Sequence, residues 1–309
     1  ILHAPQRVSC HGRNQYVLDF SRKEVVDCIY DMMYKILSES KISYIKWDMN
    51  RSITECYSVA LPADRQGEVF HRYILGVYDL YDRLTTAFPQ ILFESCASGG
   101  GRFDPGMLYY APQGWISDDT DAAERVRIQY GTSMCYPISS MGSHVSVVPN
   151  HQLNRITSLH TRANVAYFGT FGYELDLNKL TDEEIAEVKA QIIFMKEYRE
   201  LIQFGNFYRL KSPFDGNETV WMTVSEDKRK ALVFWYRERN VVNAEFTRVR
   251  LQGLDPDLIY KNEYNGTENY GDELMNLGLL TTDVTAGEPT NEDLPCTDYE
   301  SRIYVLTAE

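Results

Sequence analysis

The sequence lacks paired cysteines, long apolar runs and an excess of basic residues. Lys and Arg number 31 against 44 Asp and Glu, a net charge of −13, which disfavours nucleic acid and anionic lipid as partners. No apolar run approaches the roughly 20 residues that span a bilayer, so no membrane contact is expected. The six cysteines form no CxxC pair, which argues against a zinc knuckle and a disulfide framework: Cys10, Cys28, Cys56, Cys96, Cys135 and Cys296.

The overall composition of the chain is that of a folded globular protein. The chain has 309 residues, of which 44% are hydrophobic and 24% charged, enough for one large domain or two ordinary ones. Its 22 tyrosines suit stacking on flat neutral faces such as sugar rings. The chain opens with Ile1 and shows no initiator Met or signal peptide, from which we expect a fragment of a longer protein.

Up to about Gly205, short apolar runs alternate with amphipathic helical patterns. The predicted strands are 16–20, 42–47, 91–93, 115–117, 141–148 and 166–175. The predicted helices are 25–37, 69–84, 121–134, 150–164 and 181–204, with capping boxes at Ser21/Glu24 and Thr181/Glu184. Continuous apolar strands indicate a buried parallel sheet, with the site at the strands' carboxyl ends. Six units fit either an open sheet or a (β/α)₈ barrel entered at its third unit.

After about Lys211 the pattern changes to strands separated by turns, without a long helix. The predicted strands are 219–224, 231–236, 245–251, 258–264 and 301–306. This pattern predicts an antiparallel β-sandwich. We therefore divide the chain into a barrel domain, 1–211, and a C-terminal β-sandwich domain, 212–309.

The strongest local motif is the run 44–50, in which an apolar strand ends in polar residues. Alternation along a strand sends Lys46, Asp48 and Asn50 to one side. A carboxylate close to Lys46 stays ionised and could serve as a nucleophile or base. The alternative is an Asp48 that only caps the next loop, and the pattern alone does not choose between them.

A second motif, 115–121, again runs from a strand into acids. Adjacent carboxylates of an extended chain point in opposite directions, so at most one of Asp118 and Asp119 can face Asp48. Asp121 is interpreted as the cap of the next helix. A like charge close by would raise the pKa of one carboxyl, as a general acid requires.

The third motif, 93–104, contains three consecutive glycines that allow a close approach of the backbone to a ligand. It lacks the Lys-Ser/Thr of a phosphate loop, and Cys96 has no nearby His to activate it. His144, His151 and His160 are too dispersed for a metal triad, so no metal is expected. Two acids at strand ends without metal or phosphate chemistry indicate glycoside cleavage, with tryptophans at 47 and 115 offering apolar sugar faces.

The three motifs, at 46–50, 94–104 and 115–121, resemble the signature blocks of the α-galactosidases of glycoside hydrolase family 36 in order and spacing. A further block at 270–276 in the β domain also fits. The resemblance implies a (β/α)₈ barrel lacking its first units in this chain, followed by a C-terminal antiparallel β-sandwich. It implies a retaining double displacement without a cofactor.

Residue roles follow from the same resemblance. Asp48 matches the nucleophile and Asp118 the acid/base, whereas many relatives have Asn where Asp119 stands. The residues expected to bind substrate are Arg13, Lys46, Trp47, Asn50, Cys96, Gly99 and Asp119. The expected reaction is hydrolysis of terminal α-galactosyl residues from raffinose-family oligosaccharides, melibiose or galactolipid-type glycosides.

Members of the family are typically more than twice as long as this chain. The missing N-terminal segment of the same enzyme is therefore an expected partner, and the isolated chain is expected to be inactive or unstable. The resemblance also implies a homo-oligomer, a tetramer, in the bacterial cytoplasm. Three alternatives stay open: an α-galactosyl transferase, an α-N-acetylgalactosaminidase, and a catalytically inactive sugar-binding or assembly module.

Overall fold

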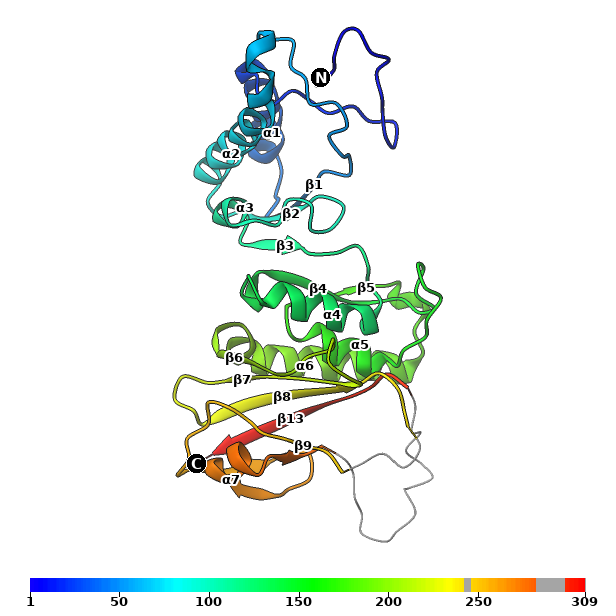
Figure 1. Ribbon diagram of the computed structural model, residues 1–309, viewed down its shortest axis with the longest axis vertical. Helices are drawn as coiled ribbons and strands as arrows, with labels where there is room; N and C mark the ends of the chain where they lie inside the picture. The colour runs from blue at the N-terminus through cyan, green and yellow to red at the C-terminus, as the bar shows by residue number, and fades with distance from the viewer. Residues whose placement is uncertain (242–245, 282–297, 309) are drawn as a thin grey trace. The chain divides into compact units, whose positions relative to one another are not determined.

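The computed structural model describes residues 1–241, 246–281 and 298–308, shown in Figure 1. They form two compact units, Ile1–Asp118 and Asp119–Glu309. Cys296 and the start of the predicted strand 245–251 lie outside the described residues. None of the helices in these ranges combines the length and apolar character needed to cross a membrane.

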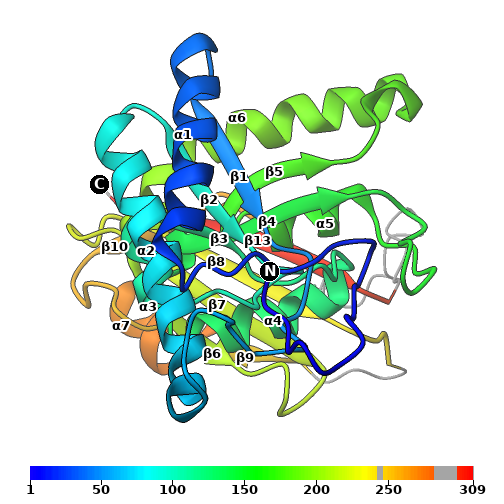
Figure 2. The ribbon, with the colours of Figure 1, turned by 90° about the horizontal axis from the view of Figure 1, so that it is seen from above.

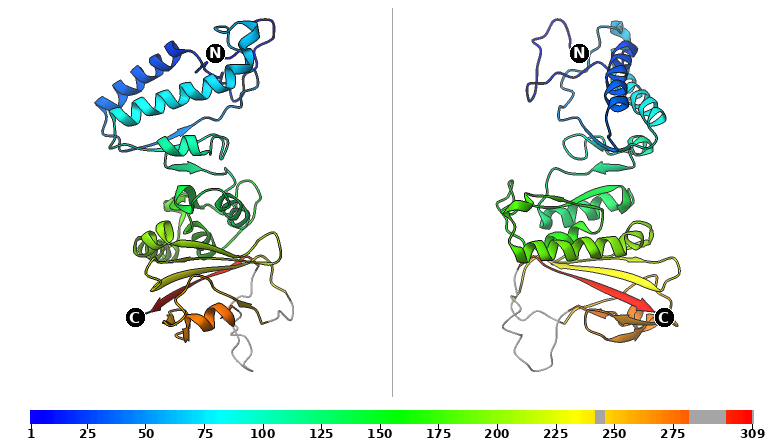
Figure 3. Two further views of the ribbon diagram at one scale, coloured as in Figure 1. Left: turned by 60° about the vertical axis from the view of Figure 1, so that its left-hand side comes forward. Right: turned by 180° about the vertical axis from the view of Figure 1, so that it is seen from behind.

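The first unit places helices against a parallel sheet. Its elements are α1 (Lys23–Glu39), β1 (Tyr44–Asp48), η1 (Ala63–Glu68), α2 (Val69–Ala87), β2 (Leu92–Cys96), α3 (Pro105–Tyr110) and β3 (Gln113–Trp115). The three strands are parallel in the order β1-β2-β3. Helices α1 and α2 lie side by side (Figures 2 and 3). Their apolar faces form one core with Phe93 of β2, as the helical periodicity predicts.

The second unit begins with helices around a pair of parallel strands. Its first elements are α4 (Ala122–Ser133), η2 (Ile138–Ser140), β4 (Met141–Ser146), α5 (Leu159–Ala166), β5 (Thr170–Glu174), η3 (Leu177–Lys179) and α6 (Asp182–Phe204). Strands β4 and β5 pair in parallel. The predicted capping box at the start of α6 is confirmed, because Thr181 and Glu184 each satisfy the other's backbone N–H.

The remaining elements of the second unit build antiparallel sheets. They are β6 (Asn206–Lys211), β7 (Glu218–Val224), β8 (Lys230–Arg237), β9 (Arg248–Val249), β10 (Ile259–Asn262), β11 (Glu268–Tyr270), α7 (Gly271–Asn276), β12 (Leu279–Leu280) and β13 (Glu300–Ala308). Six strands form one sheet in the order β11-β10-β13-β8-β7-β6, and β12 pairs with β9.

The six-stranded sheet is buried on both faces. On one face, Trp221 stacks on Phe234 with ring centroids 4.5 Å apart, and Phe168 from the end of α5 packs against both rings. On the other face, Trp235 joins an apolar cluster with residues of β9, α7 and β12. This two-layered packing explains why the strands read as continuous apolar runs rather than alternating ones.

Two predictions at the start of the chain are wrong. The residues 16–20 form no strand, because no ladder partner lies beside them among the described residues, and Val17 O accepts only the Leu2 N–H at 2.9 Å. The capping box of Ser21 and Glu24 is also absent. The Ser21 hydroxyl donates to Asp19 Oδ1 at 2.5 Å instead, and helix α1 begins at Lys23 without a side-chain cap.

The predicted helix 150–164 begins nine residues later than expected. Asn150 Oδ1 accepts the backbone N–H groups of Gln152 and Leu153 and so stabilises a turn. The helix N-cap is Ser158, whose hydroxyl accepts the Thr161 N–H at 3.0 Å. Two short helices, α3 and α7, were not predicted. Six residues each are too few for a recognisable apolar stripe.

Candidate active site

The polar end of β1 lies directly beside β2 in a parallel ladder. The register pairs Lys46 with Glu94 and Asp48 with Cys96. Because side chains alternate along a strand, Lys46 and Asp48 project from the same side of β1. The sequence predicts this grouping, and the neighbouring strand adds Glu94 and Cys96 to it.

The carboxylate of Asp48 is held by several hydrogen-bond donors. Asn50 Nδ2 donates to Asp48 Oδ2 at 2.7 Å, and the Cys96 thiol and the backbone at Ser98 and Met49 also contribute. Partial burial is the largest single influence on the pKa of Asp48 and opposes ionisation, but these hydrogen bonds together outweigh it and lower the pKa. Asp48 is therefore an ionised carboxylate at neutral pH, the state that a nucleophile or a base requires.

Cys96 is a neutral thiol rather than a thiolate. Burial, reinforced by the Asp48 carboxylate, raises the pKa of Cys96 to about 11. A neutral thiol can donate a hydrogen bond to Asp48, whereas a thiolate would repel it. Cys96 is thus suited to support the carboxylate, and not to attack a substrate itself.

Replacing Cys96 by alanine is expected to raise the pKa of Asp48, because the thiol donor is lost. A lowered pKa gives the folded state stability that is present at neutral pH and is lost as the pH falls through the folded-state pKa. In Cys96→Ala the folded-state pKa lies closer to the unfolded-state value, so this contribution to stability is smaller and its loss is complete at a higher pH. The titration midpoint of the Asp48 carboxyl carbon in ¹³C NMR spectra measures the change. Cys96→Ser, which keeps a donor, is the control, and an unmoved midpoint in the alanine variant contradicts the assignment.

Lys46 lies between an acid and an aromatic ring. Its Nζ is 3.5 Å from Glu94 Oε1 and 4.5 Å from the centroid of the Trp115 ring. Glu94 is only 2% exposed, and its other oxygen accepts hydrogen bonds from the Tyr44 hydroxyl and from Gln113 Nε2. Burial and the Glu94 carboxylate raise the pKa of Tyr44, so its hydroxyl remains a donor. The sequence places Glu94 among the polar residues at strand ends but predicts no specific role for it, because its contacts depend on the register of β1, β2 and β3.

The glycine-rich loop after β2 contacts the segment that contains Asp118. Gly99 has a φ of 83°, and a Cβ added there would lie 2.8 Å from the Ser117 Cα and 2.9 Å from the Asp118 N. The same loop begins at Cys96, which contacts Asp48. The residues 96–99 therefore lie against the segments of both predicted catalytic acids. The sequence predicts a close approach of this loop to a ligand, and the structure shows a close approach to backbone.

Arg102 joins the ends of β1 and β2. Its Nη2 donates to Trp47 O at 3.1 Å and to Cys96 O at 2.7 Å. These two carbonyls flank the paired positions of Asp48 and Cys96, so the guanidinium fixes their backbone. The sequence does not predict this role. The position of Arg102 directly after three glycines could have indicated it, because a flexible loop needs a side chain that fixes its backbone.

Arg51 likewise fixes the backbone of the turn that contains Arg13 by donating hydrogen bonds to its carbonyls. Its Nε donates to Gln15 O at 3.1 Å and its Nη2 to Cys10 O at 2.8 Å. Arg13 and Asn14 both have positive φ, 53° and 59°, and the Arg13 side chain is exposed. Arg51 thereby ties the Arg13 turn to the loop that follows Asn50.

Trp47 lies on the opposite side of β1 from Lys46, as alternation requires. Its ring packs against Tyr81 and Phe93, with centroid distances of 5.5 and 6.5 Å. It also lines a cavity of about 250 Å³ between the N-terminal segment, β1 and α2, to which Asp48 contributes as well. The structure therefore does not bring Trp47 into the group formed by Lys46, Glu94 and Trp115.

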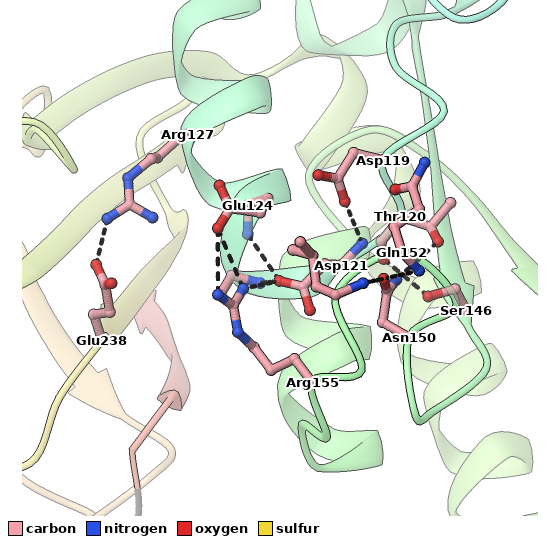
Figure 4. Close-up of polar contacts among 12 residues, drawn as sticks. Asp119, Thr120, Asp121, Glu124, Arg127, Ser146, Asn150, Gln152, Arg155 and Glu238 are labelled. Atoms are coloured by element: carbon pink, nitrogen blue, oxygen red, sulfur yellow. Dashed lines mark hydrogen bonds and ion pairs between the residues drawn. The ribbon is translucent and has the colours of Figure 1, made fainter.

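The acids after Asp118 belong to the second unit, and most of them stabilise it (Figure 4). Asp121 is confirmed as the N-cap of α4, since its Oδ1 accepts the N–H groups of Ala123 and Glu124 at 3.0 and 3.1 Å. Arg155 forms an ion pair with the same carboxylate. Asp119 Oδ1 accepts the Asp121 N–H at 3.0 Å.

Asp121→Ala is expected to lower the free energy of unfolding of the second unit by about 3 kcal/mol, because a helix cap and a buried ion pair are lost together. Asp121→Asn keeps an acceptor for the two N–H groups and is expected to cost less. Urea denaturation measures both. An equal loss of unfolding free energy in the two variants would mean that the hydrogen bonds of the cap add no stability and that only the negative charge of Asp121 matters.

The structure gives no sign of a metal centre in the residues it describes. No group of three or more His, Cys, Asp or Glu side chains among them could hold an ion. His144 Nδ1 lies 3.4 Å from Glu174 Oε2, and His160 Nε2 lies 2.9 Å from Asn164 Nδ2. These two histidines therefore have local partners within the second unit.

Comparison with known proteins gives the family. A model of the Melibiase family matches residues 1–205, and a model of the glycosyl hydrolase family 36 C-terminal domain matches residues 218–306. This chain belongs to glycoside hydrolase family 36. It is 55% identical over 278 residues to α-galactosidase AgaA of Geobacillus stearothermophilus, covering 90% of this chain and 38% of that protein. It is 52% identical over 279 residues to α-galactosidase Mel36A of Lactobacillus acidophilus, again covering 90% and 38%.

Solved structures of family 36 enzymes show the same fold. The crystal structure of AgaA matches with a TM-score of 0.93 at 51% identity and covers 100% of this chain and 41% of that one. The predicted fold class is confirmed: part of a (β/α)₈ barrel followed by a C-terminal antiparallel β domain. The chain spans about two fifths of the length of these relatives. The division of this chain at 211/212 stays a prediction.

Proposed function

We propose that the protein carrying this chain is a retaining α-galactosidase that removes terminal α-galactosyl residues from raffinose-family oligosaccharides, melibiose or galactolipid-type glycosides. The observation that carries the proposal is the ionised Asp48 carboxylate, joined through the loop 96–99 to the segment of Asp118. A retaining glycosidase needs two such acids at one sugar: one attacks and the other transfers a proton.

In the first step, an Asp48 oxygen attacks the anomeric carbon while Asp118, protonated, gives its proton to the departing glycosidic oxygen. The bond between the sugar and the leaving group breaks as the bond to Asp48 forms, giving a β-linked galactosyl ester. In the second step, Asp118 takes a proton from water, and the water oxygen displaces Asp48. Two inversions restore the α configuration.

The remaining predicted site residues bind the galactose in this proposal. Lys46 and Asn50 contact its hydroxyls from the end of β1, and Cys96 and Gly99 do so from the loop after β2. Arg13, Trp47 and Asp119 complete the proposed set. The position of Lys46 and Asn50 beside the Asp48 carboxylate supports the first pair.

The relatives support the substrate class. AgaA variants have been crystallised with raffinose and with stachyose. Each of these two variants has one aspartate replaced, and the two replaced aspartates lie 70 positions apart in that enzyme. Asp48 and Asp118 are also 70 positions apart (118 − 48), which supports assigning the two acids to this pair.

A trapped covalent intermediate tests the proposal directly. The protein as its gene encodes it is treated with a fluorinated galactoside that has an activated leaving group, digested, and analysed by mass spectrometry. We expect one galactosyl adduct on the peptide that contains Asp48. Turnover of melibiose with the adduct on another residue would contradict the assignment, and no turnover of any galactoside would favour an inactive sugar-binding module.

Product analysis separates the enzymatic alternatives, since all would share the two acids. Raffinose, melibiose and an α-N-acetylgalactosaminide are each supplied, and the released sugars are identified. We expect free galactose from the first two and none from the third. Galactosylated oligosaccharides as the main products would indicate a transferase instead.

We also propose that activity requires the regions of the relatives that this chain does not span, and that the enzyme is a tetramer in the bacterial cytoplasm. Expressing the 309-residue chain alone and with its flanking sequence tests the first part, and sedimentation analysis tests the second. Full activity of the chain alone, as a monomer, would contradict both.

A further inference from the structure

Glu94 is a buried acid for which the double displacement has no direct use. It is 2% exposed and one strand away from Asp48, and its polar contacts with Tyr44, Gln113 and Lys46 lie within the first unit. Its Oε2 accepts hydrogen bonds from Tyr44 and Gln113. Its Oε1 is buried without a hydrogen-bond partner among the described residues and lies 3.5 Å from Lys46 Nζ.

This arrangement orients the carboxylate toward Lys46. The two donors on Oε2 restrain the rotation of the carboxyl group, and Oε1 lies 3.5 Å from the Lys46 ammonium. A buried carboxylate that lacks a compensating charge is strongly unfavourable, and Lys46 supplies that charge. On its other side, the ammonium lies over the Trp115 ring.

Lys46 needs such support because its side chain is long, flexible and 38% exposed. A free lysine of this kind samples many rotamers, and fixing it on substrate binding costs conformational entropy. Glu94 and Trp115 hold the ammonium on the same side of β1 as Asp48 before a substrate arrives.

We propose that Glu94 is a positioning residue, which holds the Lys46 ammonium in place for binding a sugar hydroxyl beside Asp48. This inference rests on the proposed function for the identity of the sugar. It does not make Glu94 a catalytic residue, because Glu94 touches Lys46 and not the substrate.

The first test needs no catalytic activity. The protein is labelled with 5-fluorotryptophan, and the Trp115 resonance is assigned in ¹⁹F NMR spectra from the Trp115→Phe variant. Lys46→Met removes the cation from the ring and shifts this resonance. We expect Glu94→Gln to shift it in the same direction, and to add no further shift in the Lys46→Met background. The resonances of Trp221 and Trp235 should stay in place and report that the second unit is folded, and the Trp47 resonance, from a ring packed against Tyr81, reports the same for the first unit.

Two further variants keep this test decisive. Glu94→Asp retains the charge but withdraws the carboxylate by one methylene, and it replaces Glu94→Gln if that variant fails to fold. Glu68→Gln makes the same chemical change at a partly exposed acid that pairs with Arg65 and Arg72, and it should leave the Trp115 resonance unchanged. An unshifted Trp115 resonance in folded Glu94→Gln would overturn the proposal.

The second test is a double-mutant cycle on kcat/KM with melibiose. If Glu94 acts through Lys46, Glu94→Gln lowers kcat/KM about tenfold in the wild-type background and has almost no effect when Lys46 is already Met. Equal losses in both backgrounds would overturn the proposal. If no variant or wild-type protein turns over a galactoside, the proposed function fails, and the NMR experiment still decides whether Glu94 positions Lys46.

Discussion

Replacing Asp48 by alanine is expected to lower kcat/KM for galactosides at least about 10⁴-fold, because the substitution removes the proposed nucleophile. The carboxylate lies at the end of β1, and the hydrogen bonds around it hold it ionised. Initial rates with melibiose measure the loss in the protein as its gene encodes it. Asp79→Ala, the same change at an exposed acid of α2, serves as the control and should leave the rate unchanged.

Azide supplies the missing nucleophile and makes the result specific. A small anion can enter the space left by the Asp48 side chain and attack the anomeric carbon of a substrate with a good leaving group. We expect the product to be β-galactosyl azide, of inverted configuration, since only one displacement then takes place. Unchanged turnover in Asp48→Ala would remove the catalytic assignment. Rescue that yields the α-azide would contradict the proposed geometry.

Gly99→Ala is expected to destabilise the first unit by about 2–4 kcal/mol and to impair catalysis as well. The new Cβ would meet the Ser117 Cα at 2.8 Å and the Asp118 N at 2.9 Å, both backbone atoms that cannot rotate away. The φ of 83° adds strain for any residue with a side chain. To relieve this clash, the loop 96–99 must move away from the backbone of Asp118.

The loss of activity should depend on the leaving group. If Asp118 is the acid/base, as proposed, its displacement matters most for melibiose, whose leaving alcohol must be protonated, and least for 4-nitrophenyl α-galactoside. Gly67→Ala is the matched control, because nothing lies within 4 Å of a Cβ added there, and its stability should change by less than about 1 kcal/mol. Urea denaturation and the two substrates give the measurements. Equal effects of the two alanine substitutions would contradict this role of Gly99.

Much of the site could be predicted because strand alternation is a local property. Lys46 and Asp48 share a side of β1 whatever the rest of the chain does, and Asp121 caps α4 through its own next residues. The sequence shows that Glu94 lies at a strand end, but its pairing with Lys46 could not be predicted in this way. Its position beside Lys46 depends on the register between two strands that are far apart in the sequence.

The failures have related physical causes. The run 16–20 has the composition of a strand, but a strand also needs a neighbour to pair with. The pattern of 150–158 predicts a helix, but Asn150 stabilises a turn there by accepting two backbone N–H groups. The sequence does not predict the roles of Arg102 and Arg51, because both donate hydrogen bonds to backbone carbonyls. Every residue has such a carbonyl, so the residue types give no indication of these contacts.

The neutral state of Cys96 has a practical consequence for handling the protein. Alkylating agents and oxidants react with thiolates, and a buried thiol with a pKa of about 11 provides very little thiolate at neutral pH. Cys10, Cys28 and Cys135 are exposed and meet such reagents first. Samples kept in air are therefore expected to cross-link through their surface cysteines while the sulfur beside Asp48 stays reduced.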